Sequence, residues 1–195
     1  MKIFFNKIIH FLLIGTLMTS CLHEENKILK QDQEFLELAF KLAQESREKG
    51  SHPFGAFLVF KNKIFLRGHN EVNKHNNPMK HAEIVLLENY NTYKNSNLEQ
   101  RLIMSPEFGG ELPEIKDCQI FTSTQPCQMC EGAIYTMKVG KNLSDKPQVI
   151  FGLDKENLSM IVRGHKHHSR GVKVSGPFLL EQAKVPHADF WETAS

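Results

Sequence analysis

The sequence has little of what marks several large classes of protein. It contains 4 cysteines in 195 residues, too few for a domain held together by disulfides. It has no internal repeat and no low-complexity block. Hydrophobic residues make up 41% and charged residues 24%, a balance that excludes a disordered chain, a collagen-like polymer and a polytopic membrane protein. The length suits one α/β domain with a proper core.

Net charge is also small. Of the 24 Lys and Arg residues, Lys2 and Lys7 fall within residues 1–20, which hold no acidic residue, so 22 basic residues face 22 acidic residues from Cys21 onward. A chain without net charge is poorly suited to hold nucleic acid on a broad basic face. We therefore expect a small polar substrate and no nucleic-acid partner.

Residues 1–20 are expected to be an export signal outside the fold. Two lysines precede an apolar run at Ile8–Met18, which is shorter than the about 20 residues that a membrane-spanning helix needs. Thr19 and Ser20 then precede Cys21, an order that resembles a bacterial lipoprotein signal. Cys21 would then be lipidated, residues 21–31 would form a tether, and the chain would be periplasmic or membrane-anchored through its lipid. The alternative is an uncleaved N-terminal anchor with Cys21 as an incidental thiol; without any signal, the chain would be cytoplasmic.

Residues 32–195 are expected to form one domain in which strands alternate with helices. Helical spacing of apolar residues predicts helices over about 32–49 (with Asp32 as N-cap), 80–90, 127–137 and 178–191. Short apolar runs predict strands at 56–60, 64–68, 118–122, 149–152 and 172–175, the first two forming a hairpin. Residues 91–116 lack sustained periodicity and are expected to be a surface insertion that could reshape the mouth of a pocket. This order predicts a three-layer α/β/α sandwich on a mixed five-stranded sheet.

Two short motifs carry the chemistry, His81-Ala82-Glu83 and Pro126-Cys127-Gln128-Met129-Cys130, and each opens a predicted helix. Cys127 and Cys130 lie on one face of the first helical turn, so both sulfurs can reach one ion, and the free N–H groups there favour thiolates. Together with His81 they supply three ligands and leave a fourth position for water, which is the pattern of a catalytic zinc site. A carboxylate beside such water, here Glu83, can take its proton and hand it to a leaving group.

These motifs resemble those of the cytidine deaminase-like zinc deaminases, whose signature is H-x-E followed by P-C-x-x-C. The segments PFGAFLV, GHNEV, FTSTQPCQMCEGAIY and VIFGLD make the chain most similar to the guanine deaminase and tRNA adenosine deaminase branch. The resemblance spans roughly residues 33–192. It implies that His81, Cys127 and Cys130 bind zinc and that Glu83 shuttles protons.

The resemblance also implies how a substrate is bound and what happens to it. Asn70 matches an asparagine that hydrogen-bonds the substrate ring, Phe54 lies in the stretch that forms the pocket floor, and the backbone N–H of Ala82 matches a group that contacts the ring. The implied reaction is hydrolytic deamination of a free nucleobase or nucleoside, with a purine such as guanine or adenosine preferred. A homodimer is expected from the family, and the export signal speaks against tRNA as substrate.

Other interpretations stay open at this point. The chain could deaminate cytosine or cytidine, or it could be a non-catalytic lipoprotein that keeps the zinc fold to bind a ligand, although an intact Glu83 argues against that. The CxxC pair alone could be redox-active. Asn70 could simply cap a turn, and Phe54 could be an ordinary core residue.

Two further segments have candidate functional roles. His165, His167 and His168 could form a second metal site or contact a phosphate, although such a run is more often a solvated loop. His187, Phe190 and Trp191 lie where relatives place residues that close the pocket. The alternative is an amphipathic helix that buries Phe190 and Trp191.

Overall fold

The structure is a computed structural model that describes residues 28–137, 147–162 and 174–193. The predicted export signal, Cys21 and the histidine run at 165–168 lie outside the described residues. Five strands form one mixed sheet in the order β2-β1-β3-β4-β5. Strand β1 pairs antiparallel with both neighbours, whereas β3, β4 and β5 run parallel. The strands are β1 (Gly55–Phe60), β2 (Lys63–His69), β3 (Gln119–Thr124), β4 (Gln148–Leu153) and β5 (Val174–Ser175).

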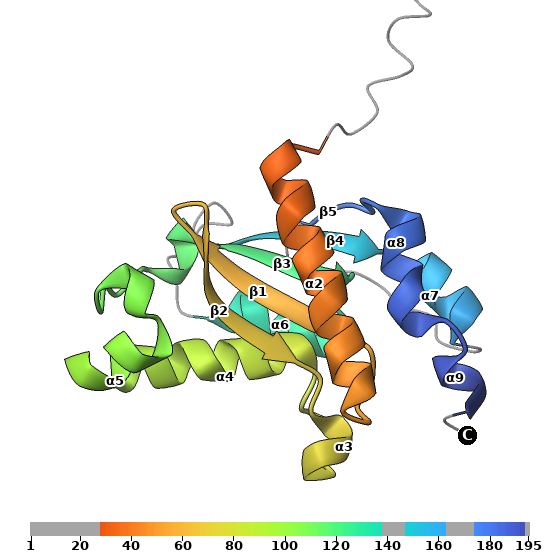
Figure 1. The fold of residues 1–195 in the computed structure, drawn as a ribbon, viewed down its shortest axis with the longest axis horizontal. Coiled ribbons are helices and arrows are strands. Elements are labelled where there is room, and N and C mark those ends of the chain that lie inside the picture. Colours follow the sequence, from red (N-terminus) through yellow and green to blue (C-terminus); the bar gives the residue numbers. More distant parts are fainter. Residues whose placement is uncertain (1–27, 138–146, 163–173, 194–195) are drawn as a thin grey trace, which may run out of the picture.

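Helices cover both faces of this sheet, so the predicted α/β/α sandwich is confirmed (Figure 1). Side chains along β1 point alternately to the two faces of the sheet. Ala56 and Leu58 therefore pack into the core on one face, and Phe57 and Val59 pack into the core on the other. The first side is covered by α4 (Ala82–Asn95) and α6 (Gln128–Thr136), and the second by α2 (Lys30–Glu48) and α8 (Leu180–Lys184). The other helices are α3 (Val72–His75), α5 (Leu98–Met104), α7 (Lys155–Ile161) and α9 (Phe190–Thr193), with short 3-10 turns at Pro106–Phe108, Ile115–Asp117 and Val185–His187.

Two boundaries differ from the sequence prediction. Helix α2 begins two residues earlier than expected, with Leu29 as its N-cap, so Asp32 lies in the first turn instead of capping it. The single closing helix predicted over 178–191 is wrong, because the segment is divided into α8, a 3-10 turn and α9. Pro186 lacks a backbone N–H, and Asp189 adopts a left-handed φ of 57°, so a continuous helix cannot form there.

Residues 91–116 are more ordered than a plain surface insertion. Helix α4 continues to Asn95, and α5 follows with a capping box built on Asn97. The hydroxyl of Tyr90 donates to the carbonyl of Pro113 (3.0 Å), and that of Tyr93 donates to the carbonyl of Glu111 (2.8 Å). The segment is thus tied to the C-terminal half of α4.

The sheet topology gathers several chain segments at one edge. The carboxyl ends of β3 and β4 lie at the same edge because these strands are parallel. The amino end of β1 and the carboxyl end of β2 reach that edge too, because β1 is antiparallel to both of its neighbours. Both helices that begin with a predicted motif, α4 and α6, start there. Open α/β sheets bind ligands at this kind of edge.

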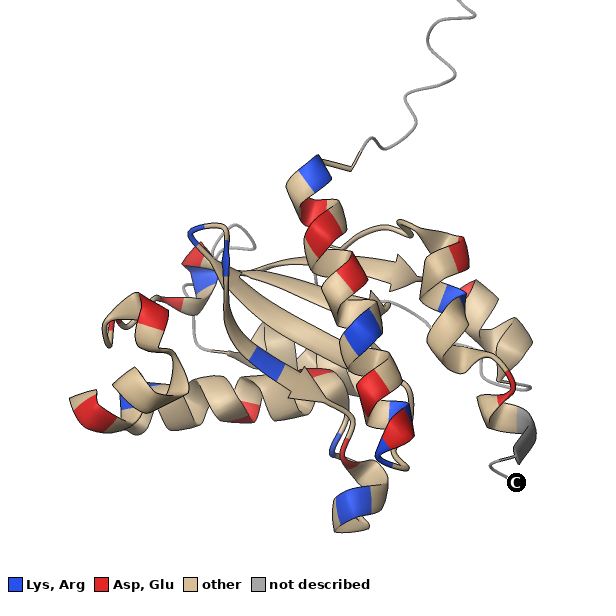
Figure 2. Ribbon diagram, in the orientation of Figure 1, with Lys and Arg blue, Asp and Glu red and all other residues tan. Residues whose placement is uncertain are grey.

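Charged residues of both signs are interspersed along α2 (Figure 2). In the part of the chain that the structure describes, no helix combines the length and apolar character needed to cross a membrane.

Gly68 fixes how closely α4 approaches the sheet, and this generates a prediction. A Cβ at Gly68 would overlap backbone atoms of Ala82 and Leu86, in the first turns of α4. We expect Gly68→Ala to lower the free energy of unfolding by about 1–3 kcal/mol, measured by chemical denaturation, because backbone must move to accept the methyl group. The matched control is Gly132→Ala in α6, where a Cβ meets open space and helix propensity predicts a gain of about 0.5–1 kcal/mol. Equal stability of the two variants would contradict the close approach.

Candidate metal centre

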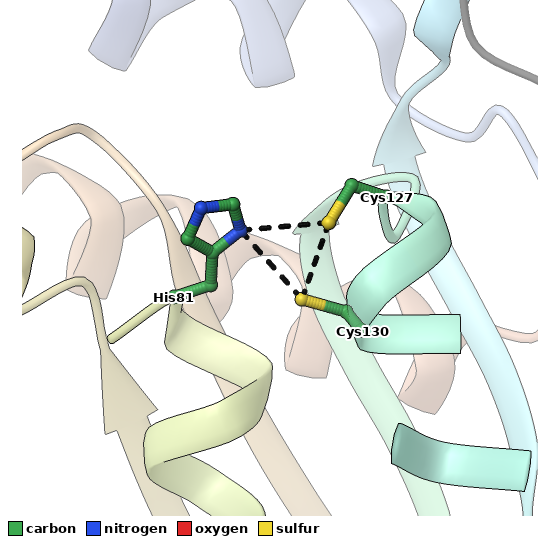
Figure 3. A group of neighbouring side chains, drawn as sticks. All are labelled: His81, Cys127 and Cys130. Atoms are coloured by element: carbon green, nitrogen blue, oxygen red, sulfur yellow. Dashed lines mark hydrogen bonds between the residues drawn. The ribbon is translucent and has the colours of Figure 1, made fainter. Parts of the chain in front are cut away.

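Three predicted ligands converge at the sheet edge. His81 is the N-cap of α4, and Cys127 is the N-cap of α6 with Cys130 one turn further on. Figure 3 shows the imidazole and the two sulfurs pointing toward one another from these helix starts. The His81 Nδ1 lies 3.5 Å from the Cys127 Sγ and 3.7 Å from the Cys130 Sγ, and the two sulfurs are 3.5 Å apart. The three ligand atoms therefore form a nearly equilateral triangle.

That triangle has the size that a tetrahedral zinc ion requires. With Zn–S bonds of about 2.3 Å and a Zn–N bond of about 2.0 Å, tetrahedral angles place the ligand atoms about 3.5–3.8 Å apart. The observed separations of 3.5–3.7 Å agree. An ion bound to these three atoms keeps one corner of its tetrahedron for a further ligand. The donor set and its spacing thus fit zinc in an open site.

The pKa values of the three ligand groups depend on the hydrogen bonds between them. The hydrogen bond between Cys127 and Cys130 is the main cause that lowers the pKa of Cys127, to about 3. The same hydrogen bond, followed by burial, raises the pKa of Cys130. Hydrogen bonding to Cys127 raises the pKa of His81 against the opposing effect of burial. The Cys130 thiol must therefore lose its proton when a metal binds.

Glu83 lies beside this centre in the first turn of α4. Its side chain is buried, and its Oε1 accepts a hydrogen bond from the Thr122 hydroxyl at 3.2 Å. Burial is the largest cause that raises the pKa of Glu83, and the Cys127 thiolate adds to it. Only a helix start allows His81 and Glu83, two residues apart, to face the same site. Sequence reasoning missed Thr122, because nothing local marks one threonine in a strand as the partner of a distant carboxylate.

A cavity of about 300 Å³ opens onto the metal centre. His81, Glu83 and Cys127 form one wall of it. Twelve residues line the cavity: His52, Phe54, His81, Glu83, Thr124, Gln125, Cys127, Lys155, Leu158, Ser159, Val162 and Trp191. None of them comes from residues 91–116, so that segment does not shape the pocket mouth as the sequence had suggested.

The three residues expected to bind substrate differ in their placement. Phe54 lines the cavity and also packs against the hydrophobic core, so it combines both roles that the sequence allowed. Asn70 and Ala82 are fully buried and do not line the cavity. The Asn70 Oδ1 accepts from the Val72 N–H at 3.1 Å, as in a turn cap, whereas its Nδ2 is a buried donor without a hydrogen-bond partner among the described residues.

The C-terminal segment lies over the cavity. Trp191 lines it, and its ring centroid is 5.2 Å from that of His52 and 6.2 Å from that of Phe54. His187 is buried against Phe54, with ring centroids 5.2 Å apart. Burial lowers the pKa of His187 to about 4. The segment therefore closes part of the cavity with neutral aromatic rings from the same chain.

Sequence reasoning also missed the wall supplied by α7. Lys155, Leu158 and Ser159 line the cavity from this helix, which begins directly after the carboxyl end of β4. The signal that could have found them is the position of the segment after a central parallel strand, where ligand-binding residues gather.

Comparison with known proteins shows what the chain is similar to. Residues 29–144 match the cytidine and deoxycytidylate deaminase zinc-binding region. A probable cytosine deaminase of Schizosaccharomyces pombe is 27% identical over 183 residues, 85% of this chain and 96% of that protein. The tRNA-specific adenosine deaminase 2 of Xenopus laevis is 25% identical over 141 residues, 69% of this chain and 67% of that protein.

Solved structures share the fold. The guanine deaminase from Nitrosomonas europaea superimposes with a TM-score of 0.59 and 17% identity, covering 85% of this chain and 87% of that one. A structure solved with 2,6-diaminopurine gives the same TM-score and identity over 87% of this chain and 86% of that one. At such identities the likeness establishes the fold alone.

The geometry predicts that zinc binding depends on both sulfurs at the centre. We expect Cys130→Ala to lower zinc affinity by more than about 100-fold, because substitutions outside the ligand shell already approach that loss. Zinc per chain, measured by elemental analysis after dialysis, tests this. The matched control is Cys118→Ala, which removes a buried thiol at the start of β3 and should leave zinc content unchanged. Full zinc in the Cys130 variant would contradict the assignment.

Proposed function

The chain belongs to the cytidine and deoxycytidylate deaminase family, and from this premise we propose that it removes the amino group of a free purine nucleobase or nucleoside by hydrolysis. Family membership makes it a zinc-dependent deaminase, a hydrolase that acts on the C–N bond of a nucleobase or nucleoside. The choice of a free purine ring is the proposal. The observation that carries it is a cavity lined both by His81, Cys127 and Glu83 and by the aromatic rings of Phe54 and Trp191.

The metal ligands are assigned to His81, Cys127 and Cys130, whose ligand atoms lie within 4.8 Å of one another. When bound there, zinc polarises water and lowers its pKa to about 7. The protein holds the site open toward the cavity, because His81 and Cys127 line it whereas Cys130 is buried behind them.

Glu83 is proposed to move the protons of the reaction. Its carboxylate takes a proton from the attacking water and passes it to a ring nitrogen next to the amino-bearing carbon. Glu83 then moves the second proton, from the hydroxyl now on that carbon, to the amino group, the C–N bond breaks, and ammonia leaves while the ring keeps the oxygen as a carbonyl. The buried position and raised pKa of Glu83 suit this double duty, since the group must accept and release protons near neutral pH. The Thr122 hydroxyl holds the carboxylate in place.

Four further residues are proposed to hold the ring. Phe54, together with Trp191, offers aromatic surface for stacking on a flat base. Asn70 does not line the cavity, but its Nδ2 is a buried donor without a partner among the described residues, and we propose that an acceptor on the ring supplies the missing hydrogen bond. The backbone N–H of Ala82, in the first turn of α4, is a free donor by its position.

The purine assignment is supported by the similarity of the motif segments to guanine and tRNA adenosine deaminases and by the purine analogue in a structure of the same fold. Cytosine is the second candidate. It is favoured by the match to a probable cytosine deaminase, which extends over 96% of that protein. Ammonia release from guanine, adenine, adenosine, cytosine and cytidine, each tested with the zinc-loaded chain, separates these candidates. Release from pyrimidines alone would contradict the purine proposal.

We also propose that the chain is exported. A basic N-terminal segment, a short apolar run and Cys21 follow one another in the sequence, as they do in an export signal. Mass spectrometry of the protein purified from its native membrane or periplasm should find a chain that begins at an acylated Cys21. A chain that retains Met1 would contradict export processing.

The role of Glu83 generates a prediction. We expect Glu83→Gln to lower kcat by at least about 100-fold while zinc content stays unchanged, because the amide cannot accept the proton from water. Steady-state ammonia release and elemental analysis measure the two quantities. The matched control is Glu88→Gln on the same helix, whose exposed carboxylate pairs with Lys80; it should retain wild-type kcat. Activity that survives in the Glu83 variant would overturn the mechanism.

A further inference from the structure

An ion pair lies buried beside the cavity, outside the catalytic groups described so far. The Nζ of Lys155 is 2.7 Å from the Oε1 of Glu131, and the two side chains are 5% and 1% exposed. Lys155 is the first residue of α7 and lines the cavity, whereas Glu131 lies on α6, directly after the ligand Cys130. The pair therefore connects α6, which begins with two of the metal ligands, to the part of the cavity wall that α7 supplies.

The backbone of Lys155 is held firmly in place. Its N–H donates to the Gln125 Oε1 at 3.2 Å, and Gln125 itself donates its N–H to the Leu153 carbonyl at 2.7 Å. Asp154 caps α7 by accepting from the Asn157 N–H at 2.6 Å. A long lysine side chain that starts from such a fixed point and ends on a buried carboxylate has little freedom left. Its ammonium group is pre-organised.

Stability alone does not account for this arrangement. Removing two charges from water costs free energy that their attraction often fails to recover, so apolar residues of similar size commonly serve a core as well or better. An ammonium group has three N–H donors, and Glu131 is its one hydrogen-bond acceptor among the described residues. Among the residues that line the cavity, Lys155 is the one lysine or arginine. A buried cation with spare donors beside a reaction cavity suits an acceptor on the ligand.

We propose that Lys155 is a specificity-determining residue that donates a hydrogen bond to a carbonyl oxygen on the substrate ring. This inference rests on the proposed function and narrows it. The preferred substrates are rings that carry an oxo group as well as the amino group that leaves, as guanine and cytosine do. Rings of the adenine type, which carry no oxo group, are disfavoured because they leave the buried ammonium with less compensation for its lost hydration.

Two pairs of ring compounds test the inference, because the members of each pair differ at the oxo position. Guanine is compared with 2,6-diaminopurine, and cytosine with 4-aminopyrimidine. Within the pair that the zinc-loaded wild type turns over, we expect kcat/KM to be at least about 10-fold higher for the oxo compound than for its partner. This is the factor expected from one hydrogen bond to a charged group. Equal values for both members would overturn the inference without any variant being made.

A double variant tests whether the Lys155–Glu131 pair causes the preference for the oxo compound. Lys155→Met with Glu131→Gln removes both charges, so that no unpaired charge stays buried. We expect it to raise KM for the oxo member by about 10- to 100-fold, to change KM for the other member less than about 3-fold, and to keep zinc. An equal loss for both members would show a structural role only and would overturn the inference. The matched control is Lys61→Met with Glu111→Gln, an exposed ion pair, which should leave both KM values unchanged.

A binding measurement separates failure of this inference from failure of the proposed function. Calorimetric titration of zinc-loaded Glu83→Gln protein with the same four compounds needs no turnover. A wild type that releases ammonia from none of them, and from neither adenine nor adenosine, contradicts the proposed function. The inference about Lys155 still stands if the oxo members bind at least about 10-fold tighter, and it falls if they do not.

Discussion

The structure depends on two helix N-termini meeting at one edge of the sheet. Helices α4 and α6 both begin there, and this places one imidazole and two sulfurs at separations of 3.5–3.7 Å. Local sequence sets the spacing within each motif, but the meeting of the motifs is set by the sheet order β2-β1-β3, because α4 follows β2 by way of α3 and α6 follows β3. Gly68 allows α4 to lie close enough to β2 for His81 to reach the sulfurs. The metal centre is thus a product of sheet topology as much as of the motifs.

The remaining groups at this edge include charged side chains that are buried. Glu83 is buried next to the thiols, and Lys155 is buried with Glu131, the residue that follows Cys130. Buried charges are costly unless they are paired or bind a metal. A zinc ion balances the thiolates, and the ion pair neutralises itself while the lysine keeps donors to spare. Glu83 and Lys155 both line the cavity, so its wall includes a carboxyl group and an ammonium group.

Much of this follows from the sequence, and what does not has a physical reason. The strands, helix α4, helix α6 and the H-x-E and P-C-x-x-C motifs depend on local periodicity and helix-start chemistry, so local patterns predict them. The broken closing helix was missed because apolar spacing over 178–191 outweighed Pro186 in the prediction. The partnership of Thr122 with Glu83, across 39 positions, and that of Lys155 with Glu131, across 24, depend on tertiary placement that periodicity does not carry.

The central claim is that one zinc ion is held by one histidine and two cysteines with a place left open. X-ray absorption at the zinc edge of the purified, zinc-loaded protein tests it directly. The account predicts about two sulfur ligands at about 2.3 Å and about two lighter ligands at about 2.0–2.2 Å, one of them with the multiple-scattering pattern of an imidazole. A shell of four sulfurs, or one without sulfur, would contradict it.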